Sequence, residues 1–185
     1  MKGKCFLFEG QGAQHKGMGK EIFDTFSEAK EIFKIGSGVT GVDLAKLCFE
    51  TEEEELNKTN NAQLAVFTFS MAVFNILVKN GFLPTCCAGF SLGECSALCA
   101  AGVFSAEDGF AIVKRRGELM HECAGETKGA MYAIIGLEDN EIENICENVK
   151  GYVIPANYNS PLQLVIAGDE KSAAKAAEKC IDKGA

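Results

Sequence analysis

The segment Gly89-Phe90-Ser91-Leu92-Gly93 constrains this chain more than any other feature of its sequence. It closes the short apolar run 86–88 and opens a segment with helical character. A G-x-S-x-G pattern at a strand-to-helix turn is typical of a nucleophile elbow, in which a sharp turn exposes the serine hydroxyl. The helix that begins there also directs free backbone N–H groups toward a developing oxyanion. The pattern therefore predicts a nucleophilic Ser91, and the alternative is a plain strand-to-helix turn.

A glycine-rich loop is predicted near the N-terminus, where the apolar run Phe6–Phe8 leads into Glu9-Gly10-Gln11-Gly12-Ala13-Gln14. A buried strand that enters such a loop predicts either a tight turn or a loop whose backbone N–H groups approach a ligand. Phosphate binding is disfavoured, because neither G-x-G-x-x-G nor the Gly-Lys-Ser/Thr ending of a P-loop is present.

Charge and hydropathy argue against two classes of partner. The 185 residues carry a formal charge of −8, whereas a general nucleic-acid binder needs a basic surface. Polar residues interrupt the longest apolar segment, 64–78, so no membrane-spanning stretch is predicted. The basic triplet 114–116 remains available to dock an acidic carrier, unless one of its side chains points into a cleft.

The nine cysteines are predicted to be buried, reduced thiols of a cytosolic protein. Their number is odd, no C-x-x-C is present, and the two histidines lie far from any ligand-like cysteine spacing, so neither a metal site nor a disulfide framework is expected. Cys5, Cys86 and Cys87 lie in apolar, strand-like runs.

The predicted fold class is α/β, with two parts. Residues 1–124 are expected to form a hydrolase-like core with a parallel sheet that carries the elbow. Residues 125–185 follow the order β-α-β-β-α, which is a ferredoxin-like unit truncated before its last strand. Ser27 and Ser105 are predicted helix N-caps, and the small, polar segment 123–128 is the predicted boundary. The predicted strands are 4–8, 85–90, 130–135, 152–158 and 162–167, and the predicted helices are 18–26, 27–33, 61–79, 92–101, 106–122, 138–150 and 169–183.

Four blocks of the sequence resemble one family in order and spacing. The chain resembles the N-terminal portion of the malonyl-CoA:acyl carrier protein transacylases, acyltransferases of fatty-acid and polyketide synthesis. The blocks are the first loop within 6–19, the serine block 88–98, the arginine block 115–120 with 129–131, and the cleft-lining hairpin 157–168.

The resemblance implies a two-step acyl transfer in the cytoplasm. Malonyl-CoA acylates Ser91, and the phosphopantetheine thiol of acyl carrier protein then accepts the malonyl group. The backbone N–H groups of Gln11 and Leu92 form the oxyanion hole, which agrees with the unsatisfied N–H groups expected at a helix start. No metal or organic cofactor is required, since coenzyme A arrives as part of the substrate.

Two further residues are assigned to substrate binding by the resemblance. Arg116 grips the free carboxylate of the malonyl group, a pairing that suits a bidentate guanidinium. The alternative is a surface arginine that pairs with Glu118 or Glu122. Asn157 is expected on a strand face that lines the cleft, and a role in capping the hairpin is equally compatible with the sequence.

The general base is missing from the predicted site. The resemblance places it in a histidine beyond the last ferredoxin-like strand, so we expect the chain to end before it and the 185 residues alone to be inactive. His15 is expected to be an exposed loop residue, and His121 a helix-terminal residue favoured by the helix dipole.

Two departures from the family pattern affect the expected acyl selectivity more than the reaction. Phe90 replaces the usual histidine before the serine, and Glu9 replaces the proline of the first loop. Two other functions stay open: a serine esterase or thioesterase with water as acceptor, and an inactive fragment that binds acyl-CoA or the carrier protein.

Overall fold

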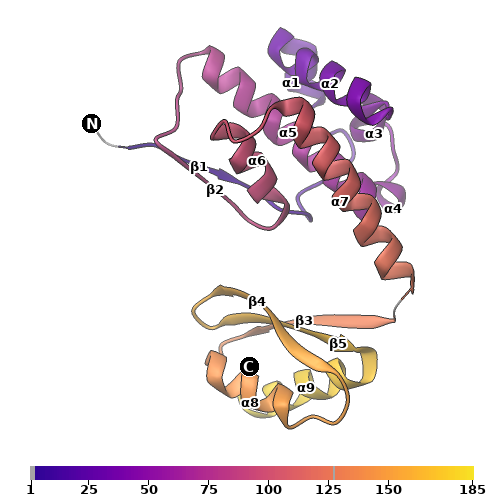
Figure 1. Cartoon of the computed structure of the whole chain (residues 1–185), viewed down its shortest axis with the longest axis vertical. Coiled ribbons are helices and arrows are strands. Elements are labelled where there is room, and N and C mark those ends of the chain that lie inside the picture. The colour runs from indigo at the N-terminus through magenta and orange to yellow at the C-terminus, as the bar shows by residue number, and fades with distance from the viewer. Residues whose placement is uncertain (1–2, 127) are drawn as a thin grey trace. The chain divides into compact units, whose positions relative to one another are not determined.

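A computed structural model describes residues 3–126 and 128–185, which form a mixed α/β protein (Figure 1). The chain divides into two compact units, unit 1 (Met1–Glu122) and unit 2 (Cys123–Ala185). The elements that begin in unit 1 are β1 (Cys5–Phe8), α1 (Lys20–Thr25), α2 (Ser27–Thr40), α3 (Leu44–Phe49), α4 (Glu53–Leu56), α5 (Thr59–Lys79), β2 (Cys86–Gly89), α6 (Leu92–Ala100) and α7 (Ala106–Glu126). Those of unit 2 are β3 (Gly129–Ile135), α8 (Asp139–Glu147), β4 (Val153–Ser160), β5 (Gln163–Asp169) and α9 (Glu170–Asp182).

In unit 1, β1 and β2 form a parallel pair in which Phe8 lies opposite Gly89. Both strands therefore deliver the chain to the same edge of the sheet, which is where the two glycine-rich segments begin. Phe6 and Phe8 pack edge-on against Phe74 of α5, with ring centroids 6.2 Å apart in each pair. These aromatic contacts pack the sheet against α5, and they thereby fix the ends of β1 and β2 from which the two glycine-rich segments begin.

The prediction that the cysteines are buried is wrong for Cys5, Cys86 and Cys123, which are exposed, while Cys87 and Cys95 are half-buried. Side chains alternate between the faces of a strand, so Cys5 and Leu7 lie opposite the face that packs on α5. Leu7 is 78% exposed on that outer face. All nine cysteines are nevertheless free.

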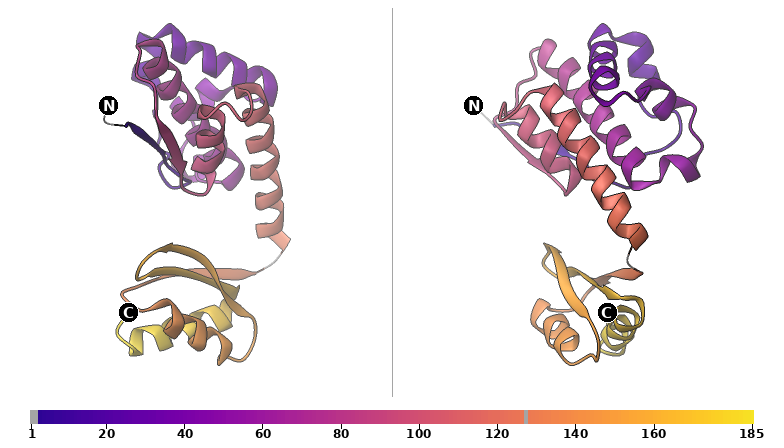
Figure 2. Two further views of the ribbon diagram at one scale, coloured as in Figure 1. Left: turned by 60° about the vertical axis from the view of Figure 1, so that its left-hand side comes forward. Right: turned by 45° about the vertical axis from the view of Figure 1, so that its right-hand side comes forward.

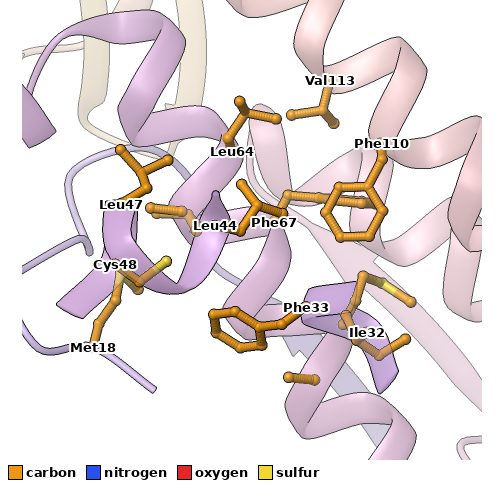
Figure 3. Packing of buried hydrophobic residues seen from close by; sticks show 14 of the residues in the cluster. Met18, Ile32, Phe33, Leu44, Leu47, Cys48, Leu64, Phe67, Phe110 and Val113 are labelled. Carbon is orange, nitrogen blue, oxygen red and sulfur yellow. The ribbon is translucent and has the colours of Figure 1, made fainter. Parts of the chain in front are cut away.

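The core of unit 1 is built from one face each of α2, α3, α5 and α7 (Figure 3). Phe67 of α5 meets Phe110 of α7 edge-on at 4.9 Å between ring centroids, and α7 runs alongside α5 (Figure 2). Gly36 in α2 allows the close approach of these layers, because a β-carbon there would lie 2.5 Å from both Leu44 and Phe110. The buried cluster includes Met18, Ile32, Phe33, Leu44, Leu47, Cys48, Leu64, Phe67, Phe110 and Val113.

The helix α5 corrects the expectation that no segment reaches membrane-spanning length. By length and composition alone its 21 residues are long and apolar enough to cross a bilayer. More than half of its most apolar window is buried inside the structure, which is the behaviour of a core helix. The buried hydroxyl of Thr68 within it is satisfied by its own helix, since it donates to the Leu64 carbonyl at 2.6 Å.

Several helix ends differ from the sequence prediction. The N-cap of α2 is Phe26, not Ser27, and α2 continues through Gly36 to Thr40. The helix α3, which was not predicted, is capped by Asp43, whose side chain accepts from the Lys46 N–H. The Ser105 cap of α7 is confirmed by a 3.1 Å hydrogen bond from the Asp108 N–H. Residues 123–126 of the predicted boundary segment are helical, and residue 127 lies outside the described residues.

Unit 2 is a three-stranded antiparallel sheet in the order β3-β5-β4, with α8 and α9 on the same face (Figure 2). Its order along the chain, β-α-β-β-α, is the predicted one. Because β3 and β4 both run antiparallel to β5, they are parallel to each other with one strand between them. The helices bury a second core that includes Ile134, Ile142, Val153, Leu164, Ile166, Ala173, Ala176 and Cys180.

Candidate active site

Ser91 occupies the turn between the end of β2 and the first residue of α6, which confirms the predicted strand-to-helix turn. Its backbone has φ 52° and ψ −104°, a conformation that a residue with a side chain adopts only under strain. The residue is exposed to solvent. The turn therefore presents a hydroxyl group at the N-terminus of a nine-residue helix.

The two glycines of the motif are required by close contacts. A β-carbon at Gly89 would lie 2.0 Å from the carbonyl carbon and oxygen of Gly93. A β-carbon at Gly93 would lie 2.2 Å from the carbonyl oxygen of Phe8. Real β-carbons essentially never come within 3.0 Å of such atoms. The missing side chain at Gly89 therefore allows the tight turn from β2 into α6, and the missing side chain at Gly93 allows the start of α6 to lie against the end of β1.

The glycine-rich loop after β1 also lies against the elbow. A β-carbon at Gly10 would lie 2.7 Å from the carbonyl oxygen of Phe90, and the Phe90 N–H donates to Phe8 at 3.1 Å. The loop is held from the other side by Gln14, whose Oε1 accepts from the Gly12 N–H at 2.8 Å. Gln11, between these two anchors, is thereby placed beside the turn.

The backbone N–H groups of Gln11 and Leu92 both lack a protein acceptor within the part of the chain that the structure describes. Leu92 is the first residue of α6, where an intrahelical acceptor does not exist. Its side chain is fully buried, so its backbone is fixed by packing. Two free donors at adjacent loops are what an oxyanion hole needs.

Arg116 on α7 reaches the elbow. Its Nη2 lies 3.2 Å from Ser91 Oγ, and its Nη1 donates to Gln63 Oε1 at 2.6 Å. The alternative that Arg116 is a surface residue paired with Glu118 or Glu122 is therefore wrong. It is Arg115 that pairs with Glu118, at 3.6 Å, and no carboxylate of residues 3–126 or 128–185 forms an ion pair with Arg116.

Gln63 on α5 is a part of the site that the sequence analysis missed. It is fully buried, and its Nε2 lies 3.3 Å from Sδ of Met120. Nothing local in the sequence singles it out, because Asn60, Asn61 and Asn75 are amide residues of the same helix. A buried amide needs partners, and here it joins α5 to the arginine of α7.

The histidines do not contact the elbow. His15 Nδ1 lies 3.4 Å from the Ala13 carbonyl in the glycine-rich loop. His121 acts on the Glu55 carboxyl instead. The hydrogen bond and charge of Lys58, and more weakly the charge of His121, lower the pKa of that carboxyl. Among the described residues the side-chain hydrogen bond to Ser91 comes from Arg116, and neither histidine makes one.

Ser91, Gln11, Leu92 and Arg116 all belong to unit 1, whereas Asn157 lies in unit 2. Asn157 is an exposed residue of β4 opposite Val165, next to a bulge in the strand pairing. Phe90 is 55% exposed. In the described ranges no group of three histidine, cysteine or acidic side chains is arranged to hold a metal ion.

Comparison with known proteins gives a consistent set of relatives. Residues 5–185 match the family described as acyl transferase domain. The malonyl CoA-acyl carrier protein transacylase of Bacillus subtilis (strain 168) is 40% identical over 184 residues, which are 98% of this chain and 58% of that relative. The protein of the same name from Escherichia coli (strain K12) is 41% identical over 98% of this chain and 60% of its own length.

Solved structures agree with these relatives. The malonyl CoA-acyl carrier protein transacylase of Clostridium perfringens superposes with a TM-score of 0.92 and 43% identity, over 99% of this chain and 58% of that one. A malonyl-transacylase in complex with a type II PKS acyl-carrier protein gives a TM-score of 0.91 and 39% identity, over 99% and 60%. This chain therefore spans about three fifths of the length of the curated relatives it matches.

Proposed function

Since this chain belongs to the acyl transferase domain family, we propose that it carries the nucleophile and the carboxylate-binding arginine of a malonyl-CoA:acyl carrier protein transacylase. In the first step Ser91 Oγ attacks the thioester carbonyl of malonyl-CoA, its proton passes to a base, and coenzyme A leaves as the thiol. In the second step the phosphopantetheine thiol of acyl carrier protein attacks the seryl ester, and the Ser91 hydroxyl is restored. Only acyl and proton transfers occur, so no metal or organic cofactor is needed.

The observation that carries the proposal is the 3.2 Å contact between Arg116 and Ser91. A cationic side chain at a nucleophilic serine, free of any acidic partner among the described residues, provides a binding position for a second negative charge on the acyl group. Malonyl has that carboxylate and acetyl does not. A guanidinium–carboxylate pair at a half-buried position is worth roughly 1.5–3 kcal/mol, about tenfold to a hundredfold in preference.

The geometry around Ser91 also supports the proposed oxyanion hole. The free N–H groups of Gln11 and Leu92 belong to two loops that the close glycine contacts hold together. Donors that are already in place when charge develops lower the barrier without reorganisation. The base in this proposal is a histidine other than His15 and His121.

The finer description of the fold is part of the same proposal. We assign residues 1–124 to a hydrolase-like core, and 125–185 to a ferredoxin-like subdomain. The elbow after a parallel strand supports the first assignment, and the β3-β5-β4 order of a split β-α-β unit supports the second. Asn157 is proposed as a substrate-binding residue of the second part. The nine free cysteines support a reducing, cytoplasmic location.

An esterase or thioesterase is the rival enzyme, because it would use the same elbow with water as acceptor. Simple hydrolysis gives no reason to place an unpaired arginine at the serine. An inactive fragment that only binds acyl-CoA or carrier protein is the non-enzyme rival, and it is separated from the proposal by whether acyl–Ser91 forms.

The test compares malonyl-CoA with acetyl-CoA as acyl donors. The protein used is this chain joined to the C-terminal part of the Bacillus subtilis relative, here called the fused chain. Replacing the arginine, Arg116→Ala, is expected to reduce the malonyl-over-acetyl preference in kcat/KM by about tenfold or more. The matched control is Arg115→Ala, since Arg115 faces Glu118 on the surface. An unchanged preference in Arg116→Ala contradicts the proposed role.

A further inference from the structure

Two cysteines lie side by side on the outer face of the parallel pair β1–β2 and take no part in the transfer steps described above. Cys5 is the first residue of β1, Cys86 is the first residue of β2, and the two are direct partners in the strand register. Direct partners in a ladder point to the same face of the sheet. Both cysteines are exposed, as is Leu7 on the same face. Backbone pairing therefore holds two accessible thiols next to each other.

The spacing of the two strands suits a bond between the sulfur atoms. Neighbouring strands lie about 4.8 Å apart, which is within the range of about 4.4–6.8 Å between α-carbons that a disulfide spans. The two thiols also interact in the reduced protein, because a side-chain hydrogen bond with Cys86 is the largest cause of the raised pKa of the Cys5 thiol. Since both residues begin their strands, a closer approach of the sulfur atoms moves only the end of the ladder that is remote from the elbow.

The other cysteines are placed differently. Among the paired strand residues that the structure describes, Cys5 and Cys86 are the only two cysteines opposite each other. Cys87 points to the opposite face of β2 and has Phe6 as its register partner. The remaining exposed cysteine, Cys123, lies near the end of α7. An oxidant in solution thus meets one prearranged pair of thiols on this sheet.

We propose that Cys5 and Cys86 form a reversible oxidation site that exchanges with small-molecule disulfides such as oxidised glutathione. One thiolate attacks a sulfur of the small disulfide, a mixed disulfide forms, and one small thiol leaves. The second thiolate attacks the protein sulfur of the mixed disulfide, so that the Cys5–Cys86 bond forms and the second small thiol leaves. The protein loses two electrons and two protons, and the small disulfide takes up both as it becomes two thiols.

This bond ties β1 to β2 at the end of the ladder opposite the elbow. Phe8 and Gly89 pair at the other end, where the glycine-rich loop and the serine turn begin, so the inference does not depend on the proposed acyl transfer. The bond closes a loop of roughly 80 residues that contains α1 to α5, and closing a long loop restricts the unfolded chain strongly. Oxidation is therefore expected to raise the urea midpoint of unit 1 by about 1–2 M.

The test treats the reduced 185-residue chain with oxidised glutathione, quenches the exchange in acid and maps the digested peptides by mass spectrometry. The peptides of Cys5 and Cys86 are expected to be joined to each other, in at least about tenfold excess over glutathione adducts of either residue, because the neighbouring thiol acts at a high effective concentration. Cys123 is expected to carry glutathione instead. Dithiothreitol is expected to restore the free thiols and the lower urea midpoint.

The decisive variant is Cys86→Ser, which keeps a small polar side chain but cannot form the bond. Cys5 is then expected to accumulate as its glutathione adduct, and the oxidant is expected to leave the urea midpoint unchanged. Cys5→Ser gives the mirror-image test if Cys86→Ser does not fold. The matched control is Cys87→Ser, because residue 87 adjoins Cys86 on the opposite face of the strand. This control is expected to keep the bond between Cys5 and Cys86 and the shift in midpoint.

Four results would overturn the proposal. Separate glutathione adducts on Cys5 and Cys86 of the wild type, without joined peptides, would show that the two thiols do not react as a pair. Joined peptides found only in a covalent dimer would show that the bond forms between chains. Oxidation that joins Cys5 or Cys86 mainly to another cysteine would contradict the assigned pairing. Equal urea midpoints for the oxidised and the reduced wild type would contradict the cross-link between β1 and β2.

Discussion

Replacing Gly93 by alanine tests the packing that places the nucleophile. The added β-carbon would lie 2.2 Å from the Phe8 carbonyl oxygen and 2.8 Å from that of Glu9. Both are backbone atoms, so relief requires the end of β1 and the start of α6 to move apart. That movement breaks the 3.1 Å hydrogen bond from the Phe90 N–H to Phe8. Overpacking costs about 1–3 kcal/mol and the lost hydrogen bond about 1 kcal/mol, so Gly93→Ala is expected to destabilise unit 1 by roughly 2–4 kcal/mol.

Urea unfolding followed by far-ultraviolet circular dichroism measures this loss. With a dependence of about 2 kcal/mol per molar urea, the midpoint is expected to fall by about 1–2 M. The control is Gly38→Ala, since Gly38 is an exposed position of α2 where an added β-carbon meets no atom within 4 Å. It is expected to stabilise the chain by about 0.5–1 kcal/mol through helix propensity. Equal midpoints for Gly93→Ala and wild type would refute the tight packing of β1 on α6.

Three other predictions concern separate parts of the molecule. Leu162, at the β4–β5 turn, has a φ of 64° that asparagine tolerates better, so Leu162→Asn is expected to raise the stability of unit 2 by about 0.5–1 kcal/mol; an unchanged or lower thermal midpoint contradicts this. Burial raises the pKa of the Cys48 thiol to about 12, so brief alkylation near pH 8 is expected to modify exposed Cys5 and Cys86 and to spare Cys48. The same burial makes folding depend on pH. Because the pKa of Cys48 is higher in the folded state, the stability contributed by its neutral thiol is fully present below the unfolded-state pKa and is lost as the pH rises toward 12. Measuring the free energy of unfolding at alkaline pH checks this loss. The 185-residue chain alone is expected to transfer malonyl at least about a hundredfold more slowly than the fused chain, since neither of its histidines bonds to Ser91; equal rates would make His121 the first residue to replace.

The elbow was predictable because its determinants are local. The sequence places Ser91 between two glycines at the junction of an apolar run and a helical segment, and the structure has the turn there. The prediction that Arg116 reaches the serine came from the resemblance to a family, since helical spacing alone left a surface ion pair open. Unit 2 was predictable for a similar reason, because its alternation of strand and helix patterns follows the chain.

The features that were missed depend on contacts between distant segments. Gly36 lies in the middle of α2, where glycine disfavours a helix by its local propensity. The helix continues through it because Leu44 and Phe110 pack into the space that a side chain would occupy. Gln63 has no local signal for its role, which exists only because α7 brings Arg116 to it. The exposure of Cys5 likewise depends on which face of β1 the helix α5 covers, and periodicity does not tell which face that is.

Malonylation of Ser91 is the most direct test of the central claim. The fused chain is mixed with malonyl-CoA, quenched in acid and digested, and the peptide that contains Ser91 is examined by mass spectrometry. The predicted result is one malonyl group on Ser91, lost on addition of the thiol form of acyl carrier protein and absent from Ser91→Ala. A malonyl group found on another residue, or labelling of equal extent in Ser91→Ala, would contradict the assignment of Ser91 as the nucleophile.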